Sequence, residues 1–161
     1  MKEYLLEVKE FGSIRIPNNI IERISTFRQL DSMDSESGGV LLGSHLNSIG
    51  RLKITDFTTP LKNDRQTRNS FFRSNQHNIE VQKVWKESCR RVTFLGLWHT
   101  HAEDIPTPSS VDIDDWKVTL RTSLYDGEGL VFLIIGNKSA KFWFGFKKSR
   151  QIDYIGEVSF E

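Results

Sequence analysis

Two of the four histidines in this chain lie two residues apart, in the stretch WHTHAEDIPTPSSVD at residues 98–112. His99 and His101 follow the run TFLGLW, whose continuous apolar character is typical of a central strand covered on both faces. Because strand side chains alternate between faces, both imidazoles can point to the same side. Zinc accepts neutral imidazole at about 2.0–2.1 Å in a tetrahedral arrangement. The pair is therefore a candidate metal site at the end of a strand.

A carboxylate has to complete such a site, and several are close in the sequence. Asp112 follows the loop AEDIPTP, at the start of a predicted helix. Two histidines and one carboxylate leave a fourth zinc position for a water whose pKa falls toward neutrality. Glu103, Asp114 and Asp115 compete with Asp112 as the third ligand, and spacing alone does not choose among them. Ser109 and Asp112 also match a helix capping box, so a purely structural role for both stays open.

The elements that position these residues alternate between helices and strands. Helices are predicted over residues 18–30, over 75–89 and from Ser109 or Ser110 onward. Strands are predicted over residues 40–46, 52–57, 93–98, 130–135, 141–147 and 153–160, with turns at NSIG (47–50) and NKSA (137–140). Residues 61–73 are polar and basic without a clear period, which predicts a surface loop. The alternation indicates an α/β fold, a mixed β-sheet flanked by helices, in a single domain of residues 1–161.

Apolar periodicity also predicts which side chains face the core. In the second helix the inward positions are expected at Ile79, Val84, Trp85 and Cys89, and in the third along Ile113, Trp116, Leu120 and Leu124. The aromatic residues Phe142, Trp143, Phe144 and Phe146 are expected to serve core and sheet packing rather than a docking patch.

Composition limits the function classes. A net charge of +1 over 161 residues gives no electrostatic reason to expect a nucleic acid or an anionic membrane as partner. The single cysteine, Cys89, excludes an intrachain disulfide and fits a reducing compartment. The N-terminus MKEYLLEVKE lacks the apolar region of a signal peptide, and no apolar stretch approaches about 20 residues. We therefore expect a soluble cytoplasmic protein.

The spacing His99-x-His101, seven residues, Ser109, two residues, Asp112 resembles the signature of the JAMM (MPN+, or JAB) metalloprotease family. That family also has the pattern E-x-x-G-x-L-x-G, which residues 36–43, ESGGVLLG, match. The resemblance covers essentially the whole chain and implies the JAB/MPN (cytidine-deaminase-like) fold. One departure is Ala102, where many relatives have proline.

The resemblance also implies roles for the residues that match. Zinc would be held by His99, His101 and Asp112, and Glu36 would accept a proton from the attacking water and deliver it to the leaving amine. Ser109 would help to hold the oxyanion. An ordinary solvated loop carboxylate is the alternative for Glu36, but the two glycines at 38 and 39 favour the functional interpretation, because they allow close approach to another strand.

The sequence disfavours three other kinds of active site: those of the zinc deaminases, the zincins and the cysteine proteases. Zinc deaminases need H-x-E and P-C-x-x-C, and a chain with one cysteine lacks the second motif. The H-E-x-x-H motif of the zincins is absent. Cys89 as a nucleophile is disfavoured by its predicted place on the apolar face of a helix.

The family typically hydrolyses the bond after the C-terminal tail of ubiquitin or a ubiquitin-like protein. The short chain resembles the prokaryotic branch, and the run GLWHTHAEDIPTPSSVDIDDW is similar to the deconjugases of CBASS antiphage operons. Those enzymes release targets joined to the C-terminus of a cGAS-like nucleotidyltransferase. The alternatives are processing of a sulfur-carrier or other ubiquitin-like protein, and a non-catalytic MPN binding scaffold. Oligomeric state stays open.

The resemblance further implies that the substrate tail lies extended along a sheet edge. The basic side chains Arg65, Arg68 and Arg73 would then be placed to meet acidic groups of the substrate. A solvated surface is the preferred interpretation of these three arginines.

Overall fold

The computed structural model describes residues 2–46 and 50–160 and, within them, ten strands and three helices. In chain order these are β1 (Glu3–Val8), β2 (Gly12–Pro17), α1 (Asn18–Ser25), β3 (Gly38–His45), β4 (Arg51–Phe57), β5 (Arg65–Thr67), β6 (Ser70–Phe72), α2 (Gln76–Glu87), β7 (Thr93–Thr100), α3 (Ser110–Thr122), β8 (Gly129–Ile135), β9 (Ser139–Phe146) and β10 (Ile152–Ser159). Within the described ranges, none of the helices combines the length and apolarity needed to cross a membrane.

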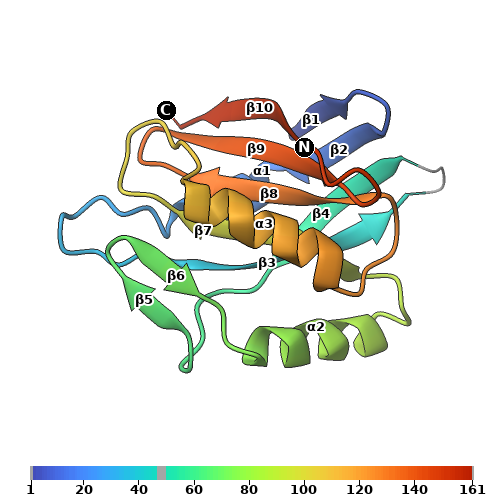
Figure 1. Ribbon diagram of the computed structural model, residues 1–161, viewed down its shortest axis with the longest axis horizontal. Helices are drawn as coiled ribbons and strands as arrows, with labels where there is room; N and C mark the ends of the chain where they lie inside the picture. The colour runs from blue at the N-terminus through green and yellow to red at the C-terminus, as the bar shows by residue number, and fades with distance from the viewer. Residues whose placement is uncertain (1, 47–49, 161) are drawn as a thin grey trace.

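Eight of the strands form one mixed sheet in the order β1-β2-β4-β3-β7-β8-β9-β10 (Figure 1). The pairs β2–β4 and β7–β8 are parallel, and the other neighbours are antiparallel. The two end strands, β1 and β10, contact each other, so the sheet is strongly curled. The predicted α/β class with a mixed sheet is confirmed.

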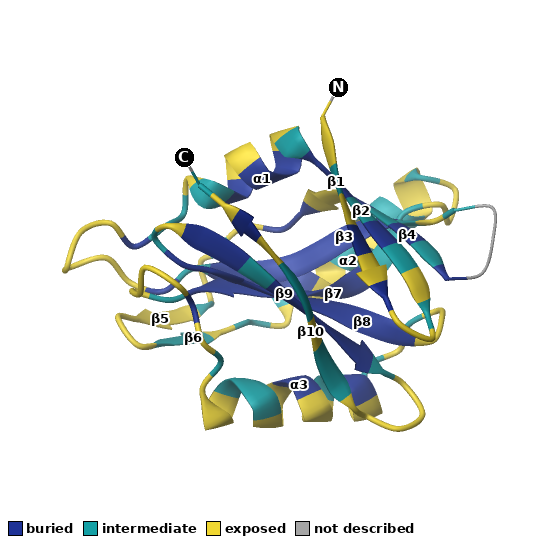
Figure 2. Cartoon of the chain, turned by 90° about the horizontal axis from the view of Figure 1, so that it is seen from above, coloured by how far each residue is buried: buried dark blue, intermediate teal, exposed yellow. Residues whose placement is uncertain are grey.

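Helices cover both faces of the sheet, with α1 on one side and α3 on the other (Figure 2). Helix α1 buries Ile20, Ile21 and Ile24 against the first face. On the second face α3 buries Trp116 and Leu120, and α2 adds partly buried valines. Strand β8 is buried along its whole length, as expected of a central strand covered on both faces.

The aromatic strand β9 packs as predicted. Phe142, Trp143 and Phe144 are buried, and Phe146 packs against the core as a partly buried residue. Trp143 also lies 5.4 Å from Trp116 of α3, measured between ring centroids, so the aromatic residues bind helix and sheet together.

Several predicted helix boundaries and inward positions are wrong. Helix α1 ends at Ser25 rather than at residue 30, and α2 spans 76–87. Ile79 is 62% exposed, and Cys89 is exposed beyond the end of α2 with φ of 56°. Leu124 is 98% exposed, because α3 ends at Thr122 and the apolar stripe stops with it. The predicted NSIG turn cannot be assessed, because residues 47–49 lie outside the described residues.

The expected surface loop over residues 61–73 is also wrong, because it contains the antiparallel hairpin β5–β6. Each strand has three residues, and all six of these residues are exposed or only partly buried. Such short, half-exposed strands leave no hydrophobic alternation in the sequence. The hairpin is held instead by long-range polar contacts that lie beside the candidate site.

Candidate active site

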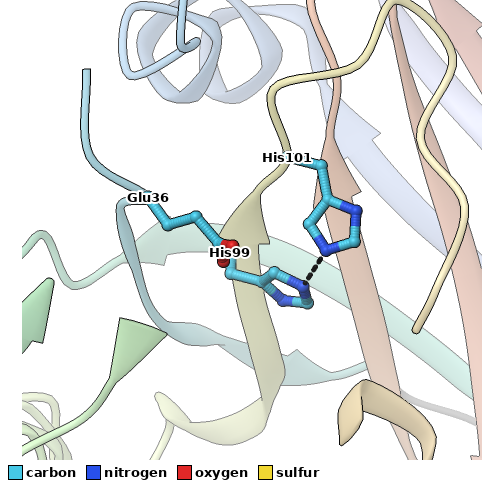
Figure 3. A group of neighbouring side chains, drawn as sticks. All are labelled: Glu36, His99 and His101. Carbon is cyan, nitrogen blue, oxygen red and sulfur yellow. Dashed lines mark hydrogen bonds between the residues drawn. The ribbon is translucent and has the colours of Figure 1, made fainter. Parts of the chain in front are cut away.

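The two histidines lie where β7 ends, with their imidazoles turned toward each other (Figure 3). His99 is paired with Gly38 of β3 on one side and with Ile134 of β8 on the other. The main-chain N–H of His101 donates to the carbonyl of Ile135. The Nε2 atoms of the two rings are 3.1 Å apart, so the predicted alternation places both on one side of the sheet.

Asp112 reaches the same point from the first turn of α3. One carboxylate oxygen lies 3.2 Å from Nε2 of His99, and the other lies 3.0 Å from Nε2 of His101. Ligands held 2.0–2.1 Å from a tetrahedral zinc ion are separated by about 3.3 Å. The donor atoms of His99, His101 and Asp112 therefore have the types and the mutual separations that fit a single zinc ion.

The capping box that competed with this assignment is also present. The Oγ of Ser109 accepts the N–H of Asp112 at 3.1 Å, and Oδ2 of Asp112 accepts the N–H of Ser109 at 2.8 Å. The box holds the carboxylate of Asp112 in front of the histidines, so the structural and the ligating roles are compatible.

Glu36 lies just before β3 and is only 5% exposed. Its neighbour Ser37 continues the β3–β7 pairing, since Thr100 donates its N–H to the carbonyl of Ser37. This pairing places Glu36 opposite His101. A carboxylate oxygen of Glu36 and a ring nitrogen of each histidine lie within 4.8 Å of one another, and Figure 3 shows these side chains converging.

The hairpin that the sequence did not predict holds the main chain of Glu36. The N–H of Glu36 donates to the carbonyl of Thr67 in β5 at 2.7 Å. The side-chain amide of Gln66 donates to the carbonyl of Glu36 at 3.0 Å. Strand β5 therefore fixes the position from which the Glu36 side chain enters the site.

The expected role of the glycines after Glu36 is confirmed at Gly39. A Cβ atom at Gly39 would lie 2.2 Å from the carbonyl oxygen of Thr58 and 2.8 Å from Nε1 of Trp98. Because the first of these is main chain, it cannot move aside. Only glycine allows β3 to approach Thr58 this closely, directly beside the candidate site.

The site combines charges of both signs in a partly buried setting. Burial raises the pKa of Glu36 to about 7, with nearby His101 opposing the change and Asp112 adding to it. Burial lowers the pKa of His99. Burial is the largest single effect on His101 and Asp112 and opposes their charged forms. The hydrogen bond between them, with the other hydrogen bonds and charges around each group, together outweigh burial, so the pKa of His101 rises to about 9 and that of Asp112 falls well below its usual range. Glu36 can therefore take up and release a proton near neutral pH.

The three carboxylates that competed with Asp112 lie elsewhere than at the Nε2 atoms of the histidine pair. Glu103 contacts the opposite nitrogen of His101, with its Oε1 2.8 Å from Nδ1. Asp115 lies 3.7 Å from Arg73, and Asp114 is exposed on α3. Of the four carboxylates that the spacing left open, the geometry brings Asp112 to the histidine pair.

The site opens into a cleft of about 1060 Å³. Its sheet-side lining includes Val40, Phe94 and Leu97, and its walls come from α3 and from the segment of β6 and the start of α2. Figure 1 shows α3 crossing the sheet, with β5, β6 and α2 next to it. Glu36, His99, His101, Ser109 and Asp112 all line this cleft. Its volume reaches the upper end of the range of about 300–1,000 Å³ for small-molecule pockets, which is enough room for a segment of peptide.

Arg73 is a residue of the cleft that the sequence interpretation misjudged. Arg65 and Arg68 are exposed, as expected of a solvated surface, but the side chain of Arg73 is only 16% exposed. Its Nε donates to the carbonyl of Gly39 at 2.8 Å, and its Nη2 donates to the carbonyl of Trp98 at 3.1 Å. Arg73 thus ties the segment after β6 to β3 and β7.

A second unpredicted group is buried behind the hairpin. The carboxylate of Asp64 accepts the main-chain N–H groups of Leu61 and Ser74, each at 2.8 Å, and lies 2.7 Å from Nε2 of His77. Nδ1 of His77 lies 2.7 Å from the hydroxyl of Thr58. Because a carboxylate only accepts, Nε2 carries the proton and Nδ1 accepts from Thr58. No local sequence pattern predicts this network, because it connects three segments: α2, the hairpin segment and the end of β4.

Comparisons with known proteins agree with the fold and identify the family. The family model described as prokaryotic homologs of the JAB domain matches residues 17–145. A protein of Escherichia coli named CD-NTase/cGAS isopeptidase is 31% identical over 150 residues, which cover 92% of this chain and 91% of the relative. A Vibrio cholerae protein of the same name is 33% identical over 138 residues, 85% of this chain and 83% of the relative.

The solution structure of a protein from Desulfitobacterium hafniense matches the fold with a TM-score of 0.61 at 20% identity, over 86% of this chain and 87% of that one. The family match covers most of the chain, including β7, His99, His101 and the start of α3. The chain therefore belongs to the prokaryotic homologues of the JAB domain.

Proposed function

We propose that this protein is a zinc-dependent isopeptidase that hydrolyses the bond joining the C-terminal tail of a cGAS-like nucleotidyltransferase to its conjugated targets, within bacterial antiphage (CBASS) defence. The names of the Escherichia coli and Vibrio cholerae relatives support the substrate class. The observation that carries the chemistry is the convergence of His99, His101 and Asp112, with Glu36 opposite them.

Zinc bound by His99, His101 and Asp112 would supply Lewis-acid polarisation of the scissile carbonyl and would activate a water at neutral pH. Glu36 is the proposed proton carrier, because its carboxylate faces the site and its pKa is about 7. It accepts the proton of the attacking water and returns it to the nitrogen of the leaving amine. Atoms balance, since the water supplies the hydroxyl of the new carboxyl group and the proton of the amine.

Ser109 is the proposed stabiliser of the developing oxyanion. Its Oγ already accepts the N–H of Asp112, so the hydroxyl proton stays available for donation into the cleft that Ser109 lines. Donors of this kind act in the transition state without needing to reorganise. The helix cap and the oxyanion donor are then two functions of one hydroxyl.

The substrate tail is proposed to lie extended beside β6. Ser70, Phe71 and Phe72 of that strand line the cleft, and among the strands described β6 pairs only with β5. An extended peptide can add main-chain hydrogen bonds to the unpaired edge of such a strand.

A cleavage assay on tail-linked fusions tests the proposal. The wild-type protein with zinc should cleave a fusion that carries the nucleotidyltransferase tail before a reporter, and Glu36→Gln should slow turnover by at least about 100-fold while zinc stays bound. Glu87→Gln makes the same change at an exposed position of α2 and should cleave normally.

Three results would contradict the proposal. Near-normal turnover by Glu36→Gln would remove the assigned base. Preferential cleavage of a sulfur-carrier or ubiquitin-like tail would replace the substrate class. A protein that binds no zinc and cleaves no fusion would be a binding scaffold.

A further inference from the structure

A carboxylate outside the set of proposed ligands contacts His101 from behind. Oε1 of Glu103 lies 2.8 Å from Nδ1 of His101, the ring nitrogen directed away from Asp112 and His99. The same oxygen accepts the main-chain N–H of Thr107 at 3.2 Å. Within residues 2–46 and 50–160, no carboxylate lies within 4.0 Å of Nδ1 of His99, so the two histidines differ in this respect.

The main chain around Glu103 is fixed, although its side chain is 45% exposed. The carbonyl of Glu103 accepts the N–H of Asn137 at 2.6 Å, and the carbonyl of Asp104 accepts the N–H of Lys138 at 2.9 Å. These bonds anchor the loop after β7 to the turn between β8 and β9. A Cβ at Gly136 would lie 2.8 Å from the carbonyl oxygen of Glu103, so the two segments are in close contact. The main chain from which the side chain of Glu103 extends therefore has a defined position.

The contact between Glu103 and Nδ1 of His101 affects which ring nitrogen of His101 carries the proton. A histidine that binds a metal through Nε2 must carry its remaining proton on Nδ1. A carboxylate that accepts the Nδ1 proton favours this tautomer, orients the ring and increases the basicity of Nε2. At His101 the donor atom Nε2 already faces Asp112 at 3.0 Å, and Glu103 occupies the position that secures it.

We infer that Glu103 is a positioning residue of the metal centre, which fixes the tautomer and the orientation of His101. The inference rests on the metal site of the proposed function. Glu103 would not be a metal ligand itself, because it contacts Nδ1 of His101, whereas the proposed metal lies on the side of Nε2. It also means that Glu103 does more than close the turn at Thr107 through a hydrogen bond.

Zinc affinity, measured by competition with a chromophoric chelator, tests the inference without any need for substrate. Glu103→Ala should weaken zinc binding by about 10- to 100-fold. Glu103→Gln keeps an acceptor for Nδ1 and for Thr107 but loses the charge, so its loss should be smaller. Asp104→Asn is the control at the neighbouring residue, because the carboxylate of Asp104 is exposed and, within the described part of the chain, pairs only with Lys138. It should bind zinc as the wild type does.

The visible absorption spectrum of the Co²⁺-loaded protein provides a readout that a simple turn-closing role would not move. It should change in Glu103→Ala and stay unchanged in Asp104→Asn. Equal zinc affinity of Glu103→Ala and the wild type, or equal losses in Glu103→Ala and Asp104→Asn, would overturn the inference. If the wild type binds zinc but cleaves no tail fusion, the substrate proposal fails while the affinity comparison still decides the role of Glu103. A wild type that binds no zinc overturns both.

Discussion

Replacing Asp64 by alanine should destabilise the protein by about 3–5 kcal/mol, because several buried hydrogen-bond donors would lose their charged acceptor. The side chains of Asp64 and His77 are 0% and 2% exposed. The substitution leaves three donors without their acceptor: the N–H groups of Leu61 and Ser74, and Nε2 of His77. Hydrogen bonds to charged groups contribute about 1.5–3 kcal/mol each, and shared partners keep the total below their sum.

Urea unfolding followed by tryptophan fluorescence measures this loss. With an m-value of about 2 kcal/mol/M, the midpoint should fall by roughly 2 M. The control Asp104→Ala removes a carboxylate that forms an exposed pair with Lys138, and its effect should stay below about 1 kcal/mol. Because β5 holds the main chain of Glu36, Asp64→Ala should also lower the rate of tail cleavage.

The pH dependence of the same variant gives a second, independent result. Burial opposes ionisation of Asp64, but the hydrogen bonds from Leu61, His77 and Ser74 prevail and hold its pKa below the usual value. A carboxyl with a lowered folded-state pKa stabilises the protein above its unfolded pKa of about 3.9, and this contribution is lost as the pH falls through the folded value. The stability difference between wild type and Asp64→Ala should therefore shrink below about pH 4. An unchanged urea midpoint at pH 7, or a stability difference that grows on acidification, would show that the ionised Asp64 carboxylate does not stabilise the fold.

Two further predictions concern the core and the proposed base. Leu120→Ala should cost about 2–5 kcal/mol in urea unfolding, because Leu120 is 3% exposed, whereas Leu124→Ala at a 98% exposed position should stay within about 0.5 kcal/mol; equal losses would contradict the observed end of α3. Glu36 has a folded-state pKa of about 7, above the unfolded value of about 4.3, so its ionisation disfavours the folded metal-free protein as the pH rises between these values. Between pH 5 and 8, metal-free wild type should therefore lose stability relative to Glu36→Gln, and parallel pH profiles of the two proteins would rule this out.

The part of the site that depends on local geometry could be predicted from the sequence. The placement of both histidines on one side follows from strand alternation, but spacing left Asp112 as one of four candidate carboxylates, and only the resemblance to a known family selected it. Glu36 could be assigned only through the resemblance to a known family. Its approach to His101 depends on the pairing of β3 with β7, which joins segments some sixty residues apart and has no local signature.

The hairpin and its supports could not be predicted, because their stabilising contacts are long-range and polar. Strands β5 and β6 have three residues each and no apolar alternation, so residues 61–73 look like a loop. Arg73 and Asp64 resemble solvated surface charges until their partners are known. The errors at Cys89 and Leu124 have a simpler origin, since apolar periodicity was extended past the ends of two helices.

The proposed zinc centre can be located by anomalous scattering at the zinc absorption edge, measured on crystals grown with zinc. We expect one strong peak about 2.0–2.2 Å from Nε2 of His99, Nε2 of His101 and a carboxylate oxygen of Asp112, with Glu36 outside the set of direct ligands. A peak bound directly by Glu36 in place of Asp112, or no peak between the two histidines, would contradict the proposed zinc centre.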